Sequence, residues 1–426
     1  MYGSFDPYRR VCSSVRVSDA TRTLWGMTVT SASDTSTARD VGRGAHQAVY
    51  LDCNATTPVD PRVAEEVSRW TVVEFGNAGS RTHNYGQVAK ERVARAREEV
   101  ALVVDANPDE VIFTSGATES NNLAILGLAE HGEASSKRHL VCTQVEHKAV
   151  LEPMQALAAR GFEVTTIRPT GGGWVDPEDV AAAVRPDTLL VSVMAVNNET
   201  GVRQPIDDVA SILADHDAFF HVDAAQAFGK ELTPLKNKRI DLISVSGHKV
   251  YAPKGIGALV ARRRRYRRPP LRPITFGGGQ ERGLRPGTLP VGLIAGLGTA
   301  ANLAREEYDQ RARRCDEIKR EAIAALEPLG IVLNGDPDRT VPHTLNFSVP
   351  GVDAEAAIVA LKDLVAISNG SACTSQSYEP SHVLLAAGLP EPQIAGALRF
   401  SWCHLTPRVD WLAVADRLGA LIQHRR

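Results

Sequence analysis

The chain has 426 residues, of which 43% are hydrophobic and 23% are charged, close to the average for globular proteins. This length fits two or three domains, and the composition excludes wholesale disorder, collagen-like repetition and a disulfide-dense small fold. The 48 Lys and Arg and 50 Asp and Glu residues give a formal net charge of −2, so overall charge gives no reason to expect direct nucleic-acid binding.

Residue patterning disfavours two further classes of protein. No uninterrupted apolar run approaches the roughly 18 residues that span a bilayer, so we expect no membrane partner. The cysteines are widely scattered, without the CxxC or Cys/His spacing of a metal site. This favours free, reduced thiols, no bound metal and a cytoplasmic location. The cysteines are Cys12, Cys53, Cys142, Cys315, Cys373 and Cys403.

Residues 1–46 differ from the rest of the chain. They are rich in Ser, Thr and Arg, contain no Lys or Glu, and lack the apolar core of a secretory signal. We therefore expect a disordered tail, or an upstream start codon with true translation beginning later, in which case the native protein lacks these residues.

From Tyr50 the chain alternates β-rich runs with helical stretches such as 88–104. This alternation predicts an α/β fold with a mostly parallel sheet covered on both faces. A long helical segment over 290–329, two short strands near Leu333 and at Leu345–Val349, and further helices predict a smaller α+β unit. We expect domains over 47–300 and 301–426. The strands expected in the large sheet are Val111–Thr114, Leu140–Thr143, Glu163–Ile167, Leu189–Met194, Phe219–Val222 and Leu242–Val245.

The segment Ser246-Gly247-His248-Lys249 directly follows one of these strands. In parallel α/β sheets, ligands bind at the carboxyl ends of strands. The amine of Lys249 can form a Schiff base with an aldehyde, while Ser246 and His248 can donate hydrogen bonds to a phosphate. A strand-end lysine by itself is more often a surface charge, so the other strand ends matter.

Asp223 stands just after a second apolar strand. A carboxylate there can keep the pyridine nitrogen of pyridoxal phosphate protonated, which makes the ring an electron sink. A buried Asp without a cationic partner is costly, so this position asks for such a partner. The plainer alternative is a helix N-cap.

Other strand ends carry polar clusters as well. After Phe113, small and hydroxyl residues lead into a helix expected over 121–129, and the N–H groups of a helix N-terminus hold phosphate. A capped helix without a ligand explains that segment equally well. Glu146-His147 and Asn197-Asn198-Glu199 follow two more strands. Polar clusters at five successive strand ends indicate a common ligand.

The C-terminal unit contains the segment 369–375, in which Gly, Ser and Thr surround Cys373. This composition predicts an exposed loop, and exposure favours a reactive thiolate. Cys142 lies within an apolar strand and is expected to be inert. Arg399 is a basic residue in an apolar setting that can bind a carboxylate bidentately, with an ordinary salt bridge as the alternative.

Taken together, these residues resemble the cysteine desulfurases of the NifS/IscS type, pyridoxal phosphate enzymes of the class V aminotransferase family. The resemblance covers 50–418 and implies the fold type I of such transferases, with a large, mostly parallel seven-stranded sheet domain and a smaller α+β C-terminal domain. It also implies conversion of L-cysteine to L-alanine, with the sulfur transferred to Cys373 as a persulfide. The motifs are Tyr50-Leu51-Asp52, Ala55-Thr56-Thr57-Pro58, Phe75-Gly76-Asn77, 114–120, Glu146-His147-Lys148, Asn197-Asn198-Glu199, Asp223, Ser246–Lys249, 277–283, Arg285-Pro286-Gly287-Thr288 and 370–375.

The resemblance implies a role for each matching residue. Lys249 would bind the cofactor aldehyde and move the substrate α-proton, and Cys373 would attack the substrate sulfur. His147 would stack on the cofactor ring and take part in proton transfer, while Asn198 and Arg399 would bind the substrate carboxylate side. The implied cofactor contacts are Ala117, Thr118, Asn198, Asp223 at the pyridine nitrogen, Gln226 at the ring hydroxyl, Ser246, His248, Lys249 and, from the partner subunit of a homodimer, Thr288.

Two segments depart from the family pattern. Trp402-Cys403-His404 stands where a Gly-Arg pair usually follows the strand of Arg399, and Ala78 stands where Pro is commoner. Neither departure touches a catalytic role, but the first puts the local shape near Arg399 in question.

The resemblance leaves the sulfur acceptor open. Enzymes of this type feed acceptor proteins for iron–sulfur cluster assembly, tRNA thiolation or, in some bacteria, DNA phosphorothioation. The Arg and Ala usage and the segments 75–87 and 281–289 are similar to the phosphorothioation enzymes of actinobacteria. The basic run 262–268 favours a solvated hairpin over a contact with nucleic acid or an acidic protein.

Two other functions remain open at this point. A selenocysteine lyase, or another class V enzyme such as an aminotransferase, shares the same cofactor cradle and needs no thiol at Cys373. A catalytically silent scaffold would instead bind sulfur-trafficking proteins without pyridoxal phosphate.

Overall fold

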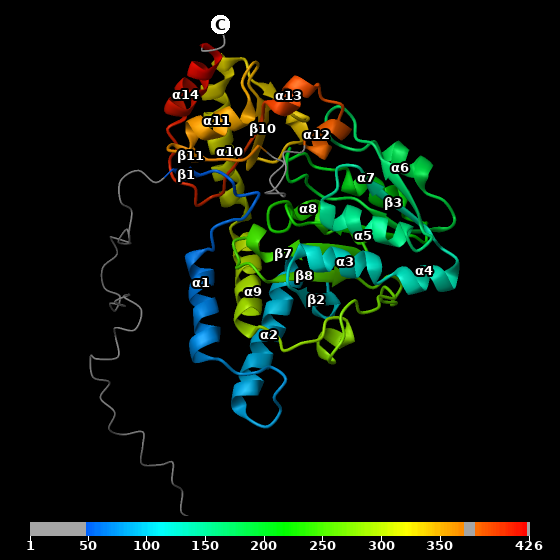
Figure 1. Cartoon of the computed structure of the whole chain (residues 1–426). Coiled ribbons are helices and arrows are strands. Elements are labelled where there is room, and N and C mark those ends of the chain that lie inside the picture. The colour runs from blue at the N-terminus through cyan, green and yellow to red at the C-terminus, as the bar shows by residue number, and fades with distance from the viewer. Residues whose placement is uncertain (1–47, 370–379, 424–426) are drawn as a thin grey trace, which may run out of the picture. The chain divides into compact units, whose positions relative to one another are not determined.

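The computed structural model describes residues 48–369 and 380–423 (Figure 1). Two features expected from the sequence, the tail over 1–46 and the thiol of Cys373, lie outside the described residues.

Seven strands form one sheet in the order β2-β8-β7-β6-β5-β3-β4. Neighbouring strands from β7 through β4 run parallel, while β8 is antiparallel to both β2 and β7. The predicted seven-stranded, mostly parallel sheet is therefore confirmed. The strands are β2 Val111–Thr114, β3 His139–Thr143, β4 Glu163–Ile167, β5 Thr188–Ser192, β6 Phe219–Asp223, β7 Leu242–Ser246 and β8 Gly257–Ala261.

The differences from the expected strands have local causes. β5 ends at Ser192, before the expected Met194, because the Met194 N–H donates to the Glu146 carboxylate at 2.7 Å instead of extending the strand. β8 was not expected. It returns antiparallel beside β7, without the intervening helix that a parallel crossover requires.

Helices cover the sheet on both faces (Figure 1). The apolar face predicted over 88–104 belongs to α2, where Ala89, Val93 and Val100 are buried. The helix expected from Asn121 begins earlier, at Ala117. The helices of this unit are α1 Pro61–Ser68, α2 Asn84–Val103, α3 Ala117–Leu126, α4 Ala129–Ser135, α5 Lys148–Ala158, α6 Pro177–Ala183, α7 Ile206–Ile212, α8 Leu232–Leu235 and α9 Val291–Glu306, with short turns η2 Arg69–Val73, η3 Pro108–Glu110, η4 Gly247–Lys249 and η5 Gln280–Gly283.

A second, smaller sheet has β10 at its centre, antiparallel to β9 and β12. Strands β1 and β11 form a separate parallel pair, in which Val49 lies opposite Val365 and Tyr50 opposite Ala366. The long helix expected over 290–329 is two helices, because α9 ends at Glu306 and α10 begins at Tyr308. The elements are β1 Val49–Tyr50, α10 Tyr308–Leu326, η6 Glu327–Leu329, β9 Val332–Leu333, η7 Pro337–Arg339, β10 Thr344–Ser348, α11 Ala354–Leu361, β11 Val365–Ala366, α12 His382–Ala386, α13 Glu391–Ala395, β12 Ala397–Ser401 and α14 Trp411–Gln423.

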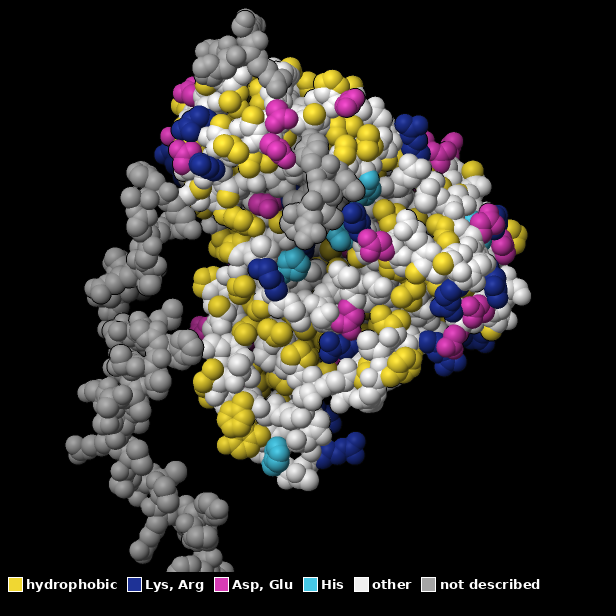
Figure 2. Space-filling model, viewed as in Figure 1, with side chains coloured by type: hydrophobic (Ala, Val, Ile, Leu, Met, Phe, Trp, Pro, Cys, Tyr) yellow, Lys and Arg dark blue, Asp and Glu magenta, His cyan; other side chains and the backbone are white. Residues whose placement is uncertain are grey.

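Surface charge is mixed. Figure 2 shows basic and acidic side chains interspersed over the visible face. Within the basic run, Arg262 is 4% exposed and donates to backbone carbonyls, including that of Leu235 at 2.7 Å. Arg263 and Arg268 both pair with Asp109. Much of the charge in the run is therefore used within the chain. Among the described helices, none is both long and apolar enough to cross a bilayer.

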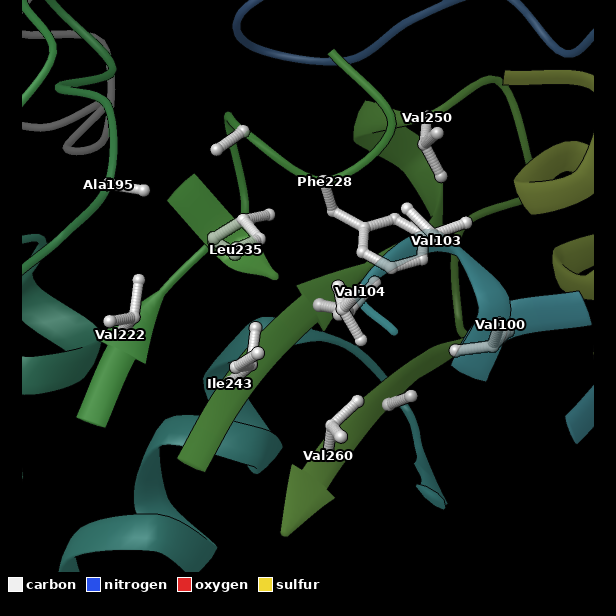
Figure 3. Packing of buried hydrophobic residues seen from close by; sticks show 14 of the residues in the cluster. Val100, Val103, Val104, Ala195, Val222, Phe228, Leu235, Ile243, Val250 and Val260 are labelled. Atoms are coloured by element: carbon white, nitrogen blue, oxygen red, sulfur yellow. The ribbon is translucent and has the colours of Figure 1, made fainter. Parts of the chain in front are cut away.

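The largest hydrophobic core lies between the sheet and helices α2 and α9. Figure 3 shows Val103 and Val104, at the end of α2, packed near Phe228 and Val260 of the sheet unit. Full burial of such side chains stabilises a fold by about 1.5–3 kcal/mol each. This packing holds the carboxyl ends of β6 and β7 in place, where the polar residues of the site begin.

Candidate active site

A cavity of about 490 Å³ opens beyond the carboxyl ends of β6 and β7 and the first turn of α3. This size and position are typical of ligand sites in α/β proteins. Thr288 does not line the cavity, and Cys373 lies outside the described residues. The predicted site residues that do line it are Ala117, Thr118, His147, Asn198, Asp223, Gln226, Ser246, His248, Lys249 and Arg399.

Lys249 is the last residue of η4, which directly follows β7. Its amine donates to the backbone carbonyl of Ala55 at 2.8 Å and also to that of Asn54. The chain around Asn54 therefore forms the opposite wall of the cavity. Because η4 fixes the backbone and these carbonyls bind the amine, Lys249 is held at the cavity edge.

Asp223 ends β6 and is 4% exposed. Its Oδ2 accepts a hydrogen bond from Asn121 Nδ2 at 2.7 Å, and its Oδ1 accepts one from Ala225 N at 2.9 Å. Among the described residues it forms no salt bridge within 4.0 Å. A buried carboxylate held by neutral donors still lacks a cationic partner. Because Asp223 lines the cavity, a ligand bound there can supply the cationic partner.

The first turn of α3 borders the cavity with Ser115, Gly116, Ala117 and Thr118. Peptide N–H groups at a helix N-terminus lack intrahelical partners and favour an anion. Glu119 supports the turn, since its carboxylate accepts a hydrogen bond from Ser115 N at 2.7 Å. This capping bond explains why α3 begins before Asn121.

Ser246 and His248 line the same cavity from β7 and η4. His248 Nδ1 lies 3.2 Å from Thr56 Oγ1. Burial, with help from Lys249 and Lys254, lowers the pKa of His248 to about 4. The imidazole is therefore neutral at neutral pH and can donate one hydrogen bond to an anion without adding charge.

His147 is the N-cap of α5, and its Nδ1 accepts a hydrogen bond from Ala149 N at 3.0 Å. Burial lowers its pKa, against the opposing influence of Asp223. The neutral ring therefore carries its proton on Nε2.

Glu146, the residue before His147, is fully buried below the cavity wall. Its Oε1 accepts hydrogen bonds from Thr143 Oγ1 at 3.0 Å and Met194 N at 2.7 Å, while its Oε2 has no partner among the described residues. Burial and the nearby Asp223 raise the pKa of Glu146 to about 8. It is therefore largely protonated at neutral pH.

Arg399, in the centre of β12, is 3% exposed. Its Nη2 donates to Asp52 Oδ1 at 2.6 Å and its Nη1 to the Asn198 carbonyl at 3.1 Å. Its buried Nε has no partner among the described residues. The guanidinium is thus fixed in direction and keeps a donor for an anionic group.

Sequence reasoning did not assign three residues of this cavity a role. Asn54 lies between two segments quoted as motifs, and Asn121 stands at the expected helix start, so sequence context placed both near the ligand. The Asn121–Asp223 hydrogen bond joins residues far apart in the sequence, and no local pattern predicts it. Lys254 also lines the cavity, and only its position soon after Lys249 in the chain hinted at this.

The donor set fits pyridoxal phosphate. Among the described residues, Asp223 has no cationic partner. A helix N-terminus together with Ser246 and His248 can bind an anion, and Lys249 supplies an amine. The buried atoms Asn121 Oδ1 and Gln226 Oε1 have no partner among the described residues, so polar groups of a ligand can satisfy them.

Comparisons with known proteins identify the family of the chain. The family model "Aminotransferase class-V" matches residues 49–410. "Cysteine desulfurase IscS" of Methylococcus capsulatus is 48% identical over 363 residues, which are 85% of this chain and 89% of that protein. Among solved structures, DndA from Streptomyces lividans is 53% identical with a TM-score of 0.74, covering 83% of this chain and 99% of that one. A structure described as "SspA in complex with cysteine" is 37% identical with a TM-score of 0.75, covering 84% and 100%.

Proposed function

This chain belongs to the class V aminotransferase family and is a pyridoxal phosphate-dependent cysteine desulfurase, and we propose that it moves the sulfur of L-cysteine to Cys373. The reaction leaves L-alanine and a persulfide on Cys373. One observation carries the proposal: Lys249, Asp223 and Arg399 line a single cavity although they come from three different elements, η4, β6 and β12. The cysteine named in the description of the SspA structure supports the same substrate.

Different cavity residues would bind different parts of the cofactor. Asp223, oriented by Asn121, would pair with the pyridine nitrogen, and Gln226 would contact the ring hydroxyl. The phosphate would lie against the start of α3, Ser246 and His248. When bound, pyridoxal phosphate supplies an aldehyde that captures an amine and a ring that withdraws electrons from the α-carbon.

Lys249 would move the proton of the substrate α-carbon. Its amine is held at the cavity edge by the carbonyls of Asn54 and Ala55, so it stays within reach of the bound substrate. His147, neutral and protonated on Nε2, would stack on the ring and assist proton transfer. Both residues act from fixed elements, which keeps the donor and acceptor atoms in position.

Arg399 would bind the substrate carboxylate, with Asn198 beside it. Asp52 and the Asn198 carbonyl already fix the guanidinium, and its unpartnered Nε offers a charge-assisted hydrogen bond. This contact would place the substrate's α-amine toward Lys249 and leave its thiol for Cys373.

The test measures alanine, sulfide and cofactor absorbance from purified protein given L-cysteine. We expect the wild type to produce alanine, and Cys373→Ser to lose sulfide release while keeping the yellow colour of bound cofactor. Lys249→Ala should lose both the colour and the reaction. The control is Cys142→Ser, a buried thiol of β3. Wild-type turnover by Cys373→Ser would rule out this thiol as the sulfur carrier.

We further propose that the enzyme is a homodimer that passes the persulfide sulfur to acceptor proteins. The sequence features shared with actinobacterial phosphorothioation enzymes favour an acceptor in DNA phosphorothioation over one in iron–sulfur assembly or tRNA thiolation. Deleting the gene and measuring phosphorothioate in DNA and thiolated nucleosides in tRNA separates these pathways. Loss confined to thiolated tRNA would overturn the preference.

A further inference from the structure

A second, much smaller cavity of about 20 Å³ lies apart from the cofactor site. It is bordered by Lys230 after β6, Tyr251 after η4, Arg311 and Cys315 of α10, and His343 before β10. None of these residues lines the cofactor cavity. The small cavity therefore joins the turn that follows Lys249 to the first helix of the C-terminal unit.

Three buried nitrogen atoms of this cavity have no hydrogen-bond partner among the described residues. They are Lys230 Nζ, Arg311 Nη1 and His343 Nε2. Arg311 is 7% exposed and His343 is 4% exposed. An unsatisfied buried donor costs about 1–3 kcal/mol, and more when it is charged. Lys230 Nζ and Arg311 Nη1 are donors by their chemistry, and His343 Nε2 is a third donor when the neutral ring carries its proton there, so an acceptor inside the cavity would satisfy them.

The described residues that line the cavity include two cationic side chains, Lys230 and Arg311, and no carboxylate. Arg311 is offset, because its Nη2 donates to Glu307 Oε2 at 2.9 Å and lies 3.5 Å from Asp60 Oδ2. Lys230 forms no salt bridge with any described carboxylate. Burial lowers its pKa, and the groups that favour its charge are the thiols of Cys53, Cys315 and Cys403.

The thiols do not satisfy the donors. Burial raises the pKa of Cys315 to about 12, so this thiol stays protonated. Hydrogen bonds from Cys53 and Thr406 Oγ1, the latter at 3.7 Å, lower the pKa of Cys403 to about 6 against the effect of burial, so this sulfur carries negative charge at neutral pH, but it already accepts these bonds and Cys403 does not line the cavity. A Lys230–thiolate pair would also leave Arg311 and His343 without acceptors.

The cavity size limits the occupant. A water molecule needs roughly 10–15 Å³ of such space, so about 20 Å³ holds one small ligand and no oxyanion such as phosphate. Water brings no charge, whereas a halide ion is attracted to both cationic side chains and can accept hydrogen bonds from Lys230, from Arg311 and from His343 when its Nε2 is protonated. We propose that this cavity is a binding site for one monovalent anion of halide size, held by Lys230, Arg311 and His343.

The direct test uses crystals of the cofactor-loaded enzyme grown in sodium bromide and diffraction data collected at the bromine absorption edge. We expect one anomalous peak inside the cavity, within hydrogen-bonding distance of Lys230 Nζ. Lys230→Met should abolish the peak. The control is Lys319→Met, because Lys319 is another partly buried lysine but its amine donates to the Val341 carbonyl at 3.0 Å. That variant should keep the peak.

A solution measurement covers the case in which a variant does not crystallise. At equal ionic strength, the wild type and Lys319→Met should unfold at a higher temperature in sodium chloride than in sodium gluconate, whose anion is too large for the cavity. Lys230→Met should lose that chloride-specific increment. Water density without anomalous signal, or a chloride increment that survives in Lys230→Met, would overturn the proposal.

Discussion

Asp52 is the residue that sets the direction of the Arg399 guanidinium, since the two side chains meet at 2.6 Å in a largely buried ion pair. We predict that Asp52→Asn raises the KM for cysteine about tenfold, equivalent to about 1.4 kcal/mol of substrate binding, with little change in kcat. The reason is that the asparagine cannot hold the guanidinium with a full charge. Steady-state kinetics of alanine formation measures both constants.

A matched control separates positioning from general stability. Asp241 is also a buried aspartate paired with an arginine, Arg239 at 2.7 Å, but it does not line the cavity. Asp241→Asn should lower the unfolding temperature and leave KM unchanged. A fall in KM for Asp52→Asn would show that Asp52 competes with the substrate carboxylate for Arg399 and does not position it.

Glu146 gives a pH-dependent contribution to stability. Its pKa is about 8 in the folded chain against an ordinary 4.5, so between these values the folded state holds a proton that the unfolded state has lost. The stability from this group is therefore full below about pH 4.5 and falls as the pH rises toward 8. We predict that Glu146→Gln, which stays neutral, unfolds at a higher temperature than the wild type at pH 8.

The difference should reach about 4 kcal/mol at pH 8 and shrink to about 1 kcal/mol or less at pH 5. Thermal unfolding of cofactor-loaded protein at the two pH values measures it. Glu152→Gln, an exposed position on α5, serves as the control and should show no such pH trend. An equal shift for Glu146→Gln at both pH values would contradict a buried, protonated carboxyl.

At the residue scale, the sequence predicted those site residues whose position after a strand can be recognised from the neighbouring sequence. Lys249, Asp223 and His147 each follow an apolar strand, and strand ends converge in parallel sheets. The hydrogen-bond partners that these residues have across the cavity could not be predicted in this way. The bonds from Asn121 to Asp223 and from Lys249 to Asn54 join distant segments, and no local spacing indicates them.

At the scale of elements, β8 and the start of α3 approach unusually closely at Gly257. A Cβ placed there would lie 2.4 Å from the Val245 carbonyl oxygen and 2.6 Å from Gly116 Cα, both of which are backbone atoms. We predict that Gly257→Ala costs about 1–3 kcal/mol of stability and weakens cofactor binding at least tenfold. The reason is that the first turn of α3 must move away from Ser246.

Thermal unfolding and titration with pyridoxal phosphate measure the two effects. Gly279→Ala is the control, because a Cβ at Gly279 meets nothing within 4 Å and its φ of −108° suits alanine. If Gly257→Ala binds the cofactor as tightly as the control, the contact between β8 and α3 does not shape the phosphate end.

Element type was predicted more reliably than element ends, for identifiable reasons. Strands β2 and β4 matched the expected ranges because apolar and β-branched runs between turns define them, although only β2 is buried throughout. Strand β8 was not predicted, because its short apolar run follows Lys249 without the intervening helix that marked the other strands. The break at Glu307 between α9 and α10 lies in a stretch of good helix formers, so packing and not propensity ends the first helix.

At the scale of the whole molecule, exposed apolar side chains point to self-association. Val72 is 70% exposed and Phe75 is 68% exposed, and Phe75 stacks on Tyr85 with ring centroids 5.6 Å apart. Figure 2 shows hydrophobic side chains gathered over this end of α1 and α2. Such a group on one face is typical of a protein–protein interface.

We predict that Val72→Asp combined with Phe75→Asp yields monomers in light scattering, whereas Leu412→Asp, at an equally exposed site on α14, leaves the dimer intact.

We propose that Thr288 contributes to the cofactor site of the neighbouring subunit, because it is exposed and does not line the cavity of its own chain. If it reaches the phosphate in the neighbouring subunit, Thr288→Ala should bind pyridoxal phosphate about tenfold more weakly without dissociating the dimer. Mixed dimers of Thr288→Ala and Lys249→Ala then decide the matter. In these dimers the intact Lys249 of one subunit faces the intact Thr288 of the partner subunit, so half of the sites should regain wild-type cofactor affinity and alanine formation. If Thr288 acts only within its own chain, no mixture restores either property.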